Sequence, residues 1–265
     1  MASGSHSIGI AYLLRGADPD WETACQRFIK SYLAHPAGQN HRMHVITKGF
    51  ESSADEARAR ELLSALDCFT ISVNDDSFDI GAYRDWAKQT SEESICLLNT
   101  GSEILSDYWL KKLHANLLNQ GIGVVGATGS FERFGGSRHG FPRFPNAHIR
   151  TTAFMLKREL YLNATQGKTF DNKMNTFLFE SGHQSLTRII KELGLKAIVV
   201  GRNGRGYGER HWATSGTFRQ GNQANLLIGA RNTRNFSNCS WPVKQVLAKS
   251  AWGKFRKRCD LYRWC

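Results

Sequence analysis

One short segment carries a dense group of side chains that could bind a sugar or a nucleotide. It reads Asn-Asp-Asp-Ser-Phe-Asp-Ile-Gly-Ala-Tyr-Arg and contains Asp75, Asp76, Asp79, Gly81 and Arg84. An acidic residue at a strand end accepts hydrogen bonds from a ribose or a base. Glycine lets the backbone approach a ligand, and arginine presents a fork of donors to a phosphate. A turn followed by a helix cap explains the acidic residues equally well, because Asp is common in both.

Polar residues also flank two apolar runs. Asn99, Gly101 and Glu103 follow the run Ser-Ile-Cys-Leu-Leu, and Arg150 stands in a polar stretch that leads into Ala-Phe-Met-Leu. Hard divalent cations prefer carboxylate oxygens, and only Glu103 of the first group supplies one. The Arg150 side chain could reach the edge of a pocket or belong to an ordinary surface loop.

Glu180 is the first candidate for a general base. It lies with His183 in the segment Phe-Glu-Ser-Gly-His-Gln-Ser, which we expect to begin a helix over residues 181–193. A carboxylate in a partly dry site can take the proton of an attacking hydroxyl. The alternative is a capping role, since acidic residues complement the positive end of a helix dipole.

A glycine-rich basic stretch follows at residues 201–212. It contains Arg202, Arg205 and Arg210, and its alternating glycines match neither the Rossmann spacing nor that of a phosphate-binding loop. Three arginines can neutralise a leaving diphosphate without a metal ion. A mobile basic loop without a ligand is the alternative.

The elements that must position these residues alternate between strands and helices. Predicted strands cover residues 8–14, 44–47, 69–73, 94–98, 122–127, 151–157 and 196–200. Predicted helices cover residues 20–35, 54–66, 79–89, 107–118 and 181–193. The alternation predicts an α/β fold with a mostly parallel, Rossmann-like sheet flanked by helices, in which ligands bind beyond the carboxyl ends of the strands. Four polar segments fall at those ends: residues 75–76, 99–103, 126–130 and 201–205.

Length and composition are those of a globular protein. The chain has 265 residues and 29.8 kDa, enough for one large domain, which we assign to residues 8–236. Residues 1–7 are polar and resemble a cloning remnant, so we leave them out. No apolar run reaches the ~20 residues of a membrane-spanning helix. The six cysteines form no Cys-x-x-Cys pair, which predicts a reduced, cytoplasmic protein without a zinc site.

Positive charge is concentrated in the last quarter of the chain. Residues 1–200 hold 22 Lys and Arg against 21 Asp and Glu, whereas residues 201–265 hold 13 against 2. Such a concentration indicates a surface that meets phosphates, an anionic membrane or nucleic acid.

The end of the chain, residues 237–265, is a basic extension. From Val243 onward it plots as a helix with Ala251 and Trp252 on an apolar side and Lys249 on the opposite side. A helix of this kind suits an anionic membrane surface. Packing of the apolar side on the core is the alternative.

The order of these segments resembles that of GT-A-type glycosyltransferases, specifically the bacterial polysaccharide-assembly enzymes of the rhamnan-synthesis group. Four segments carry the resemblance: residues 77–83, 97–103, 145–151 and 180–182. It covers roughly residues 8–230 and implies a GT-A-like fold. It also implies a nucleotide-sugar donor bound by residues 8–103 and a glycan or lipid-linked glycan acceptor bound by residues 104–236.

The resemblance gives the acidic segment a role in donor binding. Asp75 or Asp76 would touch the nucleotide, while Asp79, Gly81 and Arg84 would touch the donor sugar or its phosphates.

The same comparison leaves the metal site incomplete. Asn99 and Gly101 stand where the family carries an Asp-x-Asp that holds Mg²⁺ or Mn²⁺ against the diphosphate. His211 corresponds to a histidine that completes the metal site in many such enzymes, and Glu103 is the nearest carboxylate. Because the two aspartates are missing, we expect the arginines of the glycine-rich stretch, with Arg150, to stabilise the diphosphate.

The resemblance implies a cytoplasmic glycosyltransferase, peripheral on the inner membrane, that extends a surface polysaccharide. With Glu180 as the base, direct displacement would invert the anomeric carbon. The missing carboxylates favour a second possibility, a non-catalytic GT-A module that binds a glycan or a partner enzyme. A sugar transferase acting on nucleic acid would suit the basic end of the chain, but the sequence carries no RNA- or DNA-binding motif.

Overall fold

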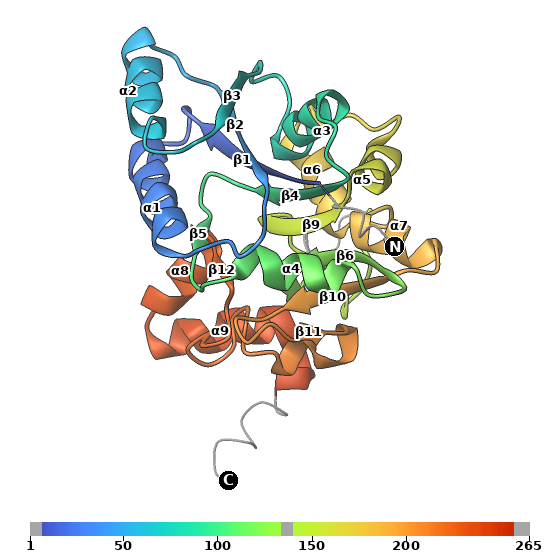
Figure 1. Ribbon diagram of the computed structural model, residues 1–265. Helices are drawn as coiled ribbons and strands as arrows, with labels where there is room; N and C mark the ends of the chain where they lie inside the picture. Colours follow the sequence, from blue (N-terminus) through green and yellow to red (C-terminus); the bar gives the residue numbers. More distant parts are fainter. Residues whose placement is uncertain (1–6, 134–139, 257–265) are drawn as a thin grey trace.

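Eight strands form the central sheet of the computed structural model, which describes residues 7–133 and 140–256 (Figure 1). In spatial order they are β11 (Gly206–Tyr207), β10 (Lys196–Val200), β6 (Ile122–Gly126), β9 (Ala153–Lys157), β4 (Ser94–Leu98), β1 (Ile8–Arg15), β2 (Arg42–Lys48) and β3 (Phe69–Ser72). Strands β9 and β11 run antiparallel to their neighbours, and the other pairings are parallel. The predicted α/β fold with a mostly parallel sheet is confirmed.

The sheet has a hydrophobic core on each face, because successive side chains of a strand point to opposite faces. In β1, Ile10, Tyr12 and Leu14 enter one core, and Ala11 and Leu13 enter the other. The first core is covered by α1 (Trp21–Ala34), α2 (Ser53–Leu63) and α4 (Trp109–Leu117). The second receives side chains from α3 (Asp79–Gln89), α5 (Arg158–Thr165), α6 (Lys173–Ser181), α7 (Leu186–Glu192), η1 (Glu209–Thr214) and α9 (Trp241–Trp252).

Short elements complete the edges of the molecule. Two small antiparallel pairs join β5 (Glu103–Ile104) to β12 (Ile228–Gly229) and β7 (Gly129–Ser130) to β8 (His148–Ile149). Helix α8 (Arg231–Asn238) follows β12, and the 3₁₀ turn η2 (Gly253–Arg256) follows α9. The β5–β12 pair brings the start of α8 beside the end of β4, far away in sequence.

The helix predicted at residues 181–193 differs in the structure. A helix precedes it, α6, whose start is fixed by the Asn172 side chain, which accepts a hydrogen bond from the Asn175 N–H at 2.9 Å. Glu180 therefore lies in the last turn of α6 rather than at a helix start, and the expectation of an N-terminal capping position is wrong. The chain turns at Gly182 before α7 begins.

The continuous C-terminal helix is also interrupted. Helix α9 ends at Trp252, because the φ of +54° at Gly253 lies outside the helical range. A Cβ at this position would lie 2.6 Å from the Phe144 ring, so the position favours glycine. Ala251 and Trp252 are buried in the second core, so the apolar side of α9 packs on the domain. Residues 257–265, to which the rest of the predicted amphipathic helix belongs, lie outside the described residues.

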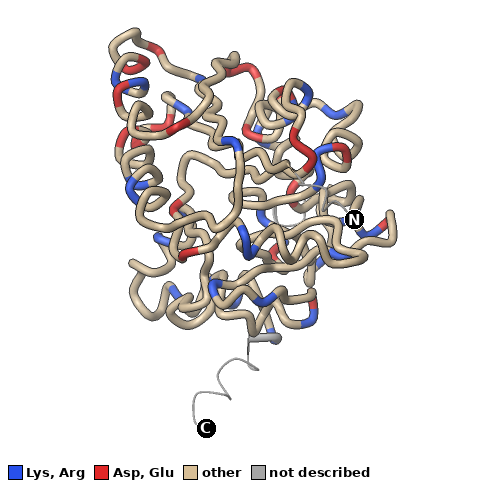
Figure 2. The backbone as a smooth tube through the Cα atoms, in the orientation of Figure 1, with Lys and Arg blue, Asp and Glu red and all other residues tan. Residues whose placement is uncertain are grey.

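Charge is distributed unevenly over the fold. Figure 2 shows acidic residues interspersed with basic ones along α2 and around α3, whereas mostly basic residues lie at the end formed by α8 and α9. Across the ranges that the structure describes, no helix has the length and hydropathy needed to cross a bilayer.

Candidate functional site

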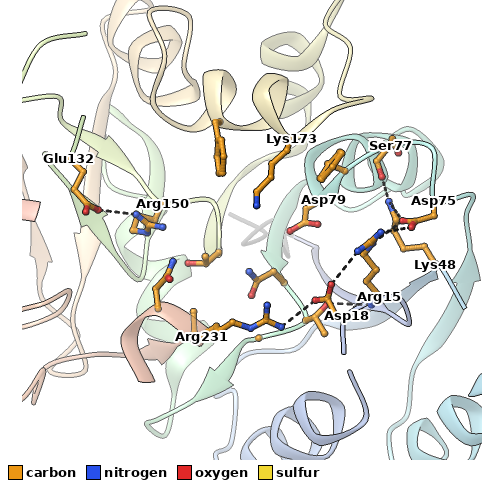
Figure 3. A pocket seen from close by; sticks show the side chains of 18 of the residues that line it. Arg15, Asp18, Lys48, Asp75, Ser77, Asp79, Glu132, Arg150, Lys173 and Arg231 are labelled. Atoms are coloured by element: carbon orange, nitrogen blue, oxygen red, sulfur yellow. Dashed lines mark hydrogen bonds and ion pairs between the residues drawn. The ribbon is translucent and has the colours of Figure 1, made fainter. Parts of the chain in front are cut away.

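A pocket of about 600 Å³ opens at the carboxyl ends of β1, β2 and β4 (Figure 3). Arg15 ends β1, Lys48 ends β2, and Asn99 follows β4. The pocket is lined by Arg15, Asp18, Lys48, Asp75, Ser77, Phe78, Asp79, Asn99, Thr100, Gly101, Glu132, Arg150, Thr152, Lys173, Phe177, Arg219, Ala230, Arg231 and Asn232. It occupies the place where open α/β sheets bind their ligands.

At one end of the pocket, Asp75 is held by two cations. Its carboxylate accepts hydrogen bonds from Arg15 Nη2 at 2.6 Å and Nε at 3.0 Å, and Lys48 Nζ lies 3.0 Å from Oδ1. Lys48 is buried and also donates to the Ser77 carbonyl. Burial would raise the pKa of Asp75, but the hydrogen bonds from Arg15 and Lys48 outweigh it and hold the pKa below its ordinary value. This end presents fixed charges whose geometry is set before a ligand arrives.

Asp79 and Lys173 face each other across the middle of the pocket (Figure 3). Asp79 is the first residue of α3, and among the described residues its carboxylate has no side-chain hydrogen bond or ion pair. Burial raises the pKa of Asp79 above its ordinary value, and the positive charge of Lys48 offsets only part of the rise. The Lys173 ammonium lies 5.5 Å from the centre of the Phe177 ring.

At the other end of the pocket, Glu132 holds two arginines. Its carboxylate accepts from Arg219 Nη1 at 2.5 Å, from Ser250 Oγ at 3.0 Å and from Arg150 Nη1 at 3.3 Å. Both guanidinium groups lie 4.8 Å from the centre of the Phe218 ring. Arg219 has a φ of +50°, a conformation that costs a non-glycine residue free energy and that is common at functional sites.

Glu180 lies behind this wall and is not among the lining residues. Its Oε2 accepts hydrogen bonds from the Thr151 backbone N–H at 2.9 Å and the Thr151 hydroxyl at 2.6 Å, and Oε1 lies 3.7 Å from Arg150 Nη2. Burial would raise the pKa of Glu180, but the charges of Arg150 and His148 and the hydrogen bonds from Thr151 lower it. A carboxylate so committed positions Arg150 and is poorly suited to accept a proton.

The structure brings part of the predicted set together. Five of the predicted residues line the pocket: Asp75, Asp79, Asn99, Gly101 and Arg150. Ten do not: Asp76, Gly81, Arg84, Glu103, Glu180, His183, Arg202, Arg205, Arg210 and His211.

Several of the residues outside the pocket have evident structural contacts. A Cβ at Gly81 would lie 2.7 Å from the Ser77 side chain, so the glycine permits close packing at the start of α3. Arg84 donates to the Lys168 carbonyl at 2.6 Å. Asp76 and His183 are exposed to solvent.

The glycine-rich basic stretch lies at the far side of the sheet. Strand β10, which precedes it, is separated from β4 by β6 and β9. Arg202 Nε donates to the Leu226 carbonyl, and the Arg205 guanidinium lies 5.4 Å from the centre of the Tyr207 ring. Arg210 and His211 are exposed on η1. The structure thus separates the stretch from the pocket.

The side chains at this site do not fit a divalent metal ion. Over the described residues, no group of three or more His, Cys, Asp or Glu side chains is placed to hold one. Glu103 lies 3.3 Å from Arg234 Nη1, outside the pocket, and His211 is on η1. The two metal ligands named from the sequence are therefore apart.

Sequence reasoning missed most of the cations in the pocket. Arg15 and Lys48 directly follow the predicted strands at residues 8–14 and 44–47, so the rule that ligands bind at strand ends could have found them. Lys173, Arg219 and Arg231 come from segments without a recognisable motif.

Comparison with known proteins identifies the fold. No protein-family model and no curated protein matches the chain. A mannosyltransferase from Pyrobaculum calidifontis, solved with GDP-Man and Mn²⁺, matches with a TM-score of 0.50 and 11% identity over 72% of this chain and 54% of that one. The chain has a GT-A-like fold. Mouse xyloside xylosyltransferase 1 matches with a TM-score of 0.44 and 11% identity over 71% of this chain and 81% of that one.

Proposed function

We propose that the protein is a glycosyltransferase that moves a sugar from a nucleotide-sugar donor to a hydroxyl of a glycan acceptor. One observation carries the proposal: in a GT-A-like sheet, the pocket at the carboxyl strand ends combines a cationic lining with a carboxylate, Asp79, that has no ion pair among the described residues. Cations suit a diphosphate, and a carboxylate suits proton transfer. The mannosyltransferase that shares the fold was solved with the nucleotide-sugar GDP-Man.

The residues at the two ends of the pocket suggest which substrate binds at each end. The nucleotide would occupy the end with Arg15, Lys48 and Asp75, which the first half of the chain supplies. The acceptor would occupy the end with Arg150 and Arg219, which the second half supplies. The transferred sugar would then lie between the two ends, beside Asp79.

Asp79 is the base in this proposal, in place of Glu180. Of the four carboxylates that line the pocket, Asp75 and Glu132 are each bound by two cations, and Asp18 lies 3.4 Å from Arg15 Nη1. The acceptor oxygen forms a bond to the anomeric carbon while the bond from that carbon to the diphosphate oxygen breaks. The acceptor proton moves to Asp79, and the electron pair leaves with the nucleoside diphosphate. Direct displacement of this kind inverts the anomeric carbon.

A polysaccharide acceptor at an anionic membrane surface completes the proposal. Trp241, Val243 and Val246 of α9 are 72%, 44% and 68% exposed, on a helix that also carries Lys244 and Lys249. Exposed apolar side chains next to lysines favour contact with anionic lipid headgroups. Lipid-linked glycan acceptors would be reached from such a surface.

Donor binding is the first test of the proposed function. Thermal denaturation is followed with UDP-, GDP-, CMP- and dTDP-sugars, with release of the free nucleotide measured in parallel. We expect one donor class to raise the melting temperature by mass action and to be slowly hydrolysed. A donor that binds without any turnover, even with added glycans, would favour the non-catalytic GT-A module. No shift with any donor would contradict both readings of the pocket.

A further inference from the structure

We infer that the pocket binds the diphosphate of the donor with its own cations and helix N-termini, without a divalent metal ion. The inference rests on the proposed function and specifies how that site holds its anion. Lys173 and Arg231 are the side chains it adds to the binding site.

Gly101, which the resemblance places where an aspartate would bind a metal ion, lies against the start of α8 and the Arg234 guanidinium. Gly101 has no side chain, and a Cβ built on it would lie 3.3 Å from the backbone nitrogen of Arg231. The Gly101 carbonyl accepts a hydrogen bond from Arg234 Nη1 at 2.9 Å. A side chain at this position would contact the first turn of α8 and the Arg234 guanidinium.

The carboxylates at the pocket are matched by its own cations. Six cationic and four acidic side chains line it, and two carboxylates outside the lining, Asp20 and Glu180, lie against Arg231 and Arg150. Lys173 is the lining cation that has no carboxylate partner among the described residues, so its charge is available to a diphosphate. Metal ions also need free carboxylate oxygens, and most of those in this pocket are taken up by arginine or lysine.

Three helices begin at the pocket. Asp79, Lys173 and Arg231 are the first residues of α3, α6 and α8, and all three line it. The N-cap residue of α3 is Phe78, whose side chain holds no oxygen that could cap the first turn. At the start of α8 the Ala230 N–H donates to the Thr233 hydroxyl and the Thr233 N–H donates to the Ala230 carbonyl. Helix N-termini carry partial positive charge and free N–H donors, both of which favour a phosphate.

Lys173 and Arg231 enter the pocket from opposite walls (Figure 3). Arg231 is oriented by Asp20, 2.5 Å from Nη2, and by Asp18 at 3.5 Å. Lys173 has no ion pair within the described ranges, so its ammonium is free to follow the leaving phosphate as negative charge develops there. Stabilising that charge is the task a metal performs in a metal-dependent transferase.

Calorimetric titration with UDP, GDP and dTDP tests the inference. Each nucleotide is titrated once in excess EDTA and once in excess MnCl₂ against the full chain and against Lys173→Met, Arg231→Met and Arg231→Lys. We expect one nucleotide to bind with the same Kd, within about twofold, under both conditions. Each Met variant should weaken binding by about tenfold or more under both, because a charge-assisted hydrogen bond is lost, and Arg231→Lys should recover part of the loss. Lys168→Met is the matched control, because Lys168 lies outside this pocket. The nucleotide affinity of this variant should equal that of the parent chain.

The outcomes separate this inference from the proposed function. Binding that appears only with MnCl₂, or is weakened about tenfold by EDTA, overturns the inference and leaves glycosyl transfer standing. The inference is also overturned if Lys173→Met and Arg231→Met both bind the nucleotide with unchanged affinity. No binding of any nucleotide under either condition overturns the proposed function and the inference together.

Discussion

Asp79 in the pocket lining and Glu180 behind it have pKa values displaced in opposite directions, and this separates their roles. Burial raises the pKa of Asp79, whose ionised form is therefore costly and reactive. We expect Asp79→Asn to lower turnover by about 10²- to 10⁴-fold, the usual contribution of a general base. Its melting temperature at neutral pH should be unchanged or higher, because the variant no longer buries a charge. Nucleotide affinity should not fall, and a variant with full turnover would remove Asp79 from the mechanism.

Substitution of Glu180, which positions Arg150, should lower the stability of the fold, unlike substitution of Asp79. Its pKa is lowered in the folded state, so it contributes stability above the unfolded pKa, and this stability is lost as the pH falls through the folded value. Glu180→Gln should cost about 2 kcal/mol at neutral pH, or about 5 °C in melting temperature. The difference from the parent chain should shrink on acidification. Melting curves from neutral to acidic pH check this, and an equal difference throughout would contradict it.

At the residue scale, the sequence predicts pocket residues where they follow a strand. Asp75 and Asn99 were found this way, because the carboxyl ends of parallel strands must meet at one edge of the sheet. Lys173 and Arg231 could not be found, since each reaches the pocket only through the placement of a helix that begins at that residue. The segment that contains Arg202 was wrongly predicted to lie at the pocket. It follows a strand, but that strand lies across the sheet from the pocket.

At the scale of elements, the sequence predicted the strands and the longer helices, whereas short helices were missed. The seven predicted strands are all present, and most are apolar runs that the sheet buries, whereas the edge strand β3 is largely exposed. Helices α5 and α6 were missed, since eight or nine residues provide little periodicity and their ends are set by contacts such as the Asn172 cap. The end of α9 depends on Gly253 meeting Phe144, a contact that local sequence does not reveal.

Helix α9 supports the end of the pocket that contains Arg219 as well as the core. Trp252 is 1% exposed, and its indole N–H donates to the Phe218 carbonyl at 2.8 Å. Trp252→Ala should destabilise the protein by about 3–5 kcal/mol through the cavity it leaves. Denaturant unfolding measures this, with the exposed Val246→Ala as a control expected within about 0.5 kcal/mol of the parent chain.

Trp252→Phe tests whether the helix also positions the pocket. It keeps most of the ring volume and removes the hydrogen bond to the loop that carries Arg219. We expect the KM for the acceptor to rise while nucleotide affinity stays constant. Equal losses for donor and acceptor would show that α9 acts through overall stability alone.

At the scale of the whole molecule, the charge asymmetry predicts where the protein works. The formal net charge is +12, and residues 201–265 hold 13 basic against 2 acidic side chains. Cosedimentation with vesicles of phosphatidylglycerol and phosphatidylcholine should therefore weaken as salt is added. It should also weaken when phosphatidylglycerol is omitted, because the attraction is to anionic headgroups.

Lipid and nucleic acid differ in how they use the apolar side chains of α9. A membrane takes up exposed Trp241 and Val246 together with the charge of Lys244 and Lys249, whereas duplex DNA responds to the charge alone. Replacing both lysines by Gln should weaken vesicle binding by about 30-fold, at ~1 kcal/mol for each lysine. Trp241→Ala should weaken binding to vesicles and leave binding to duplex DNA unchanged. If Trp241→Ala affects neither and the lysine variant weakens only DNA binding, then the basic end serves nucleic acid, and the membrane-associated glycan acceptor must be abandoned.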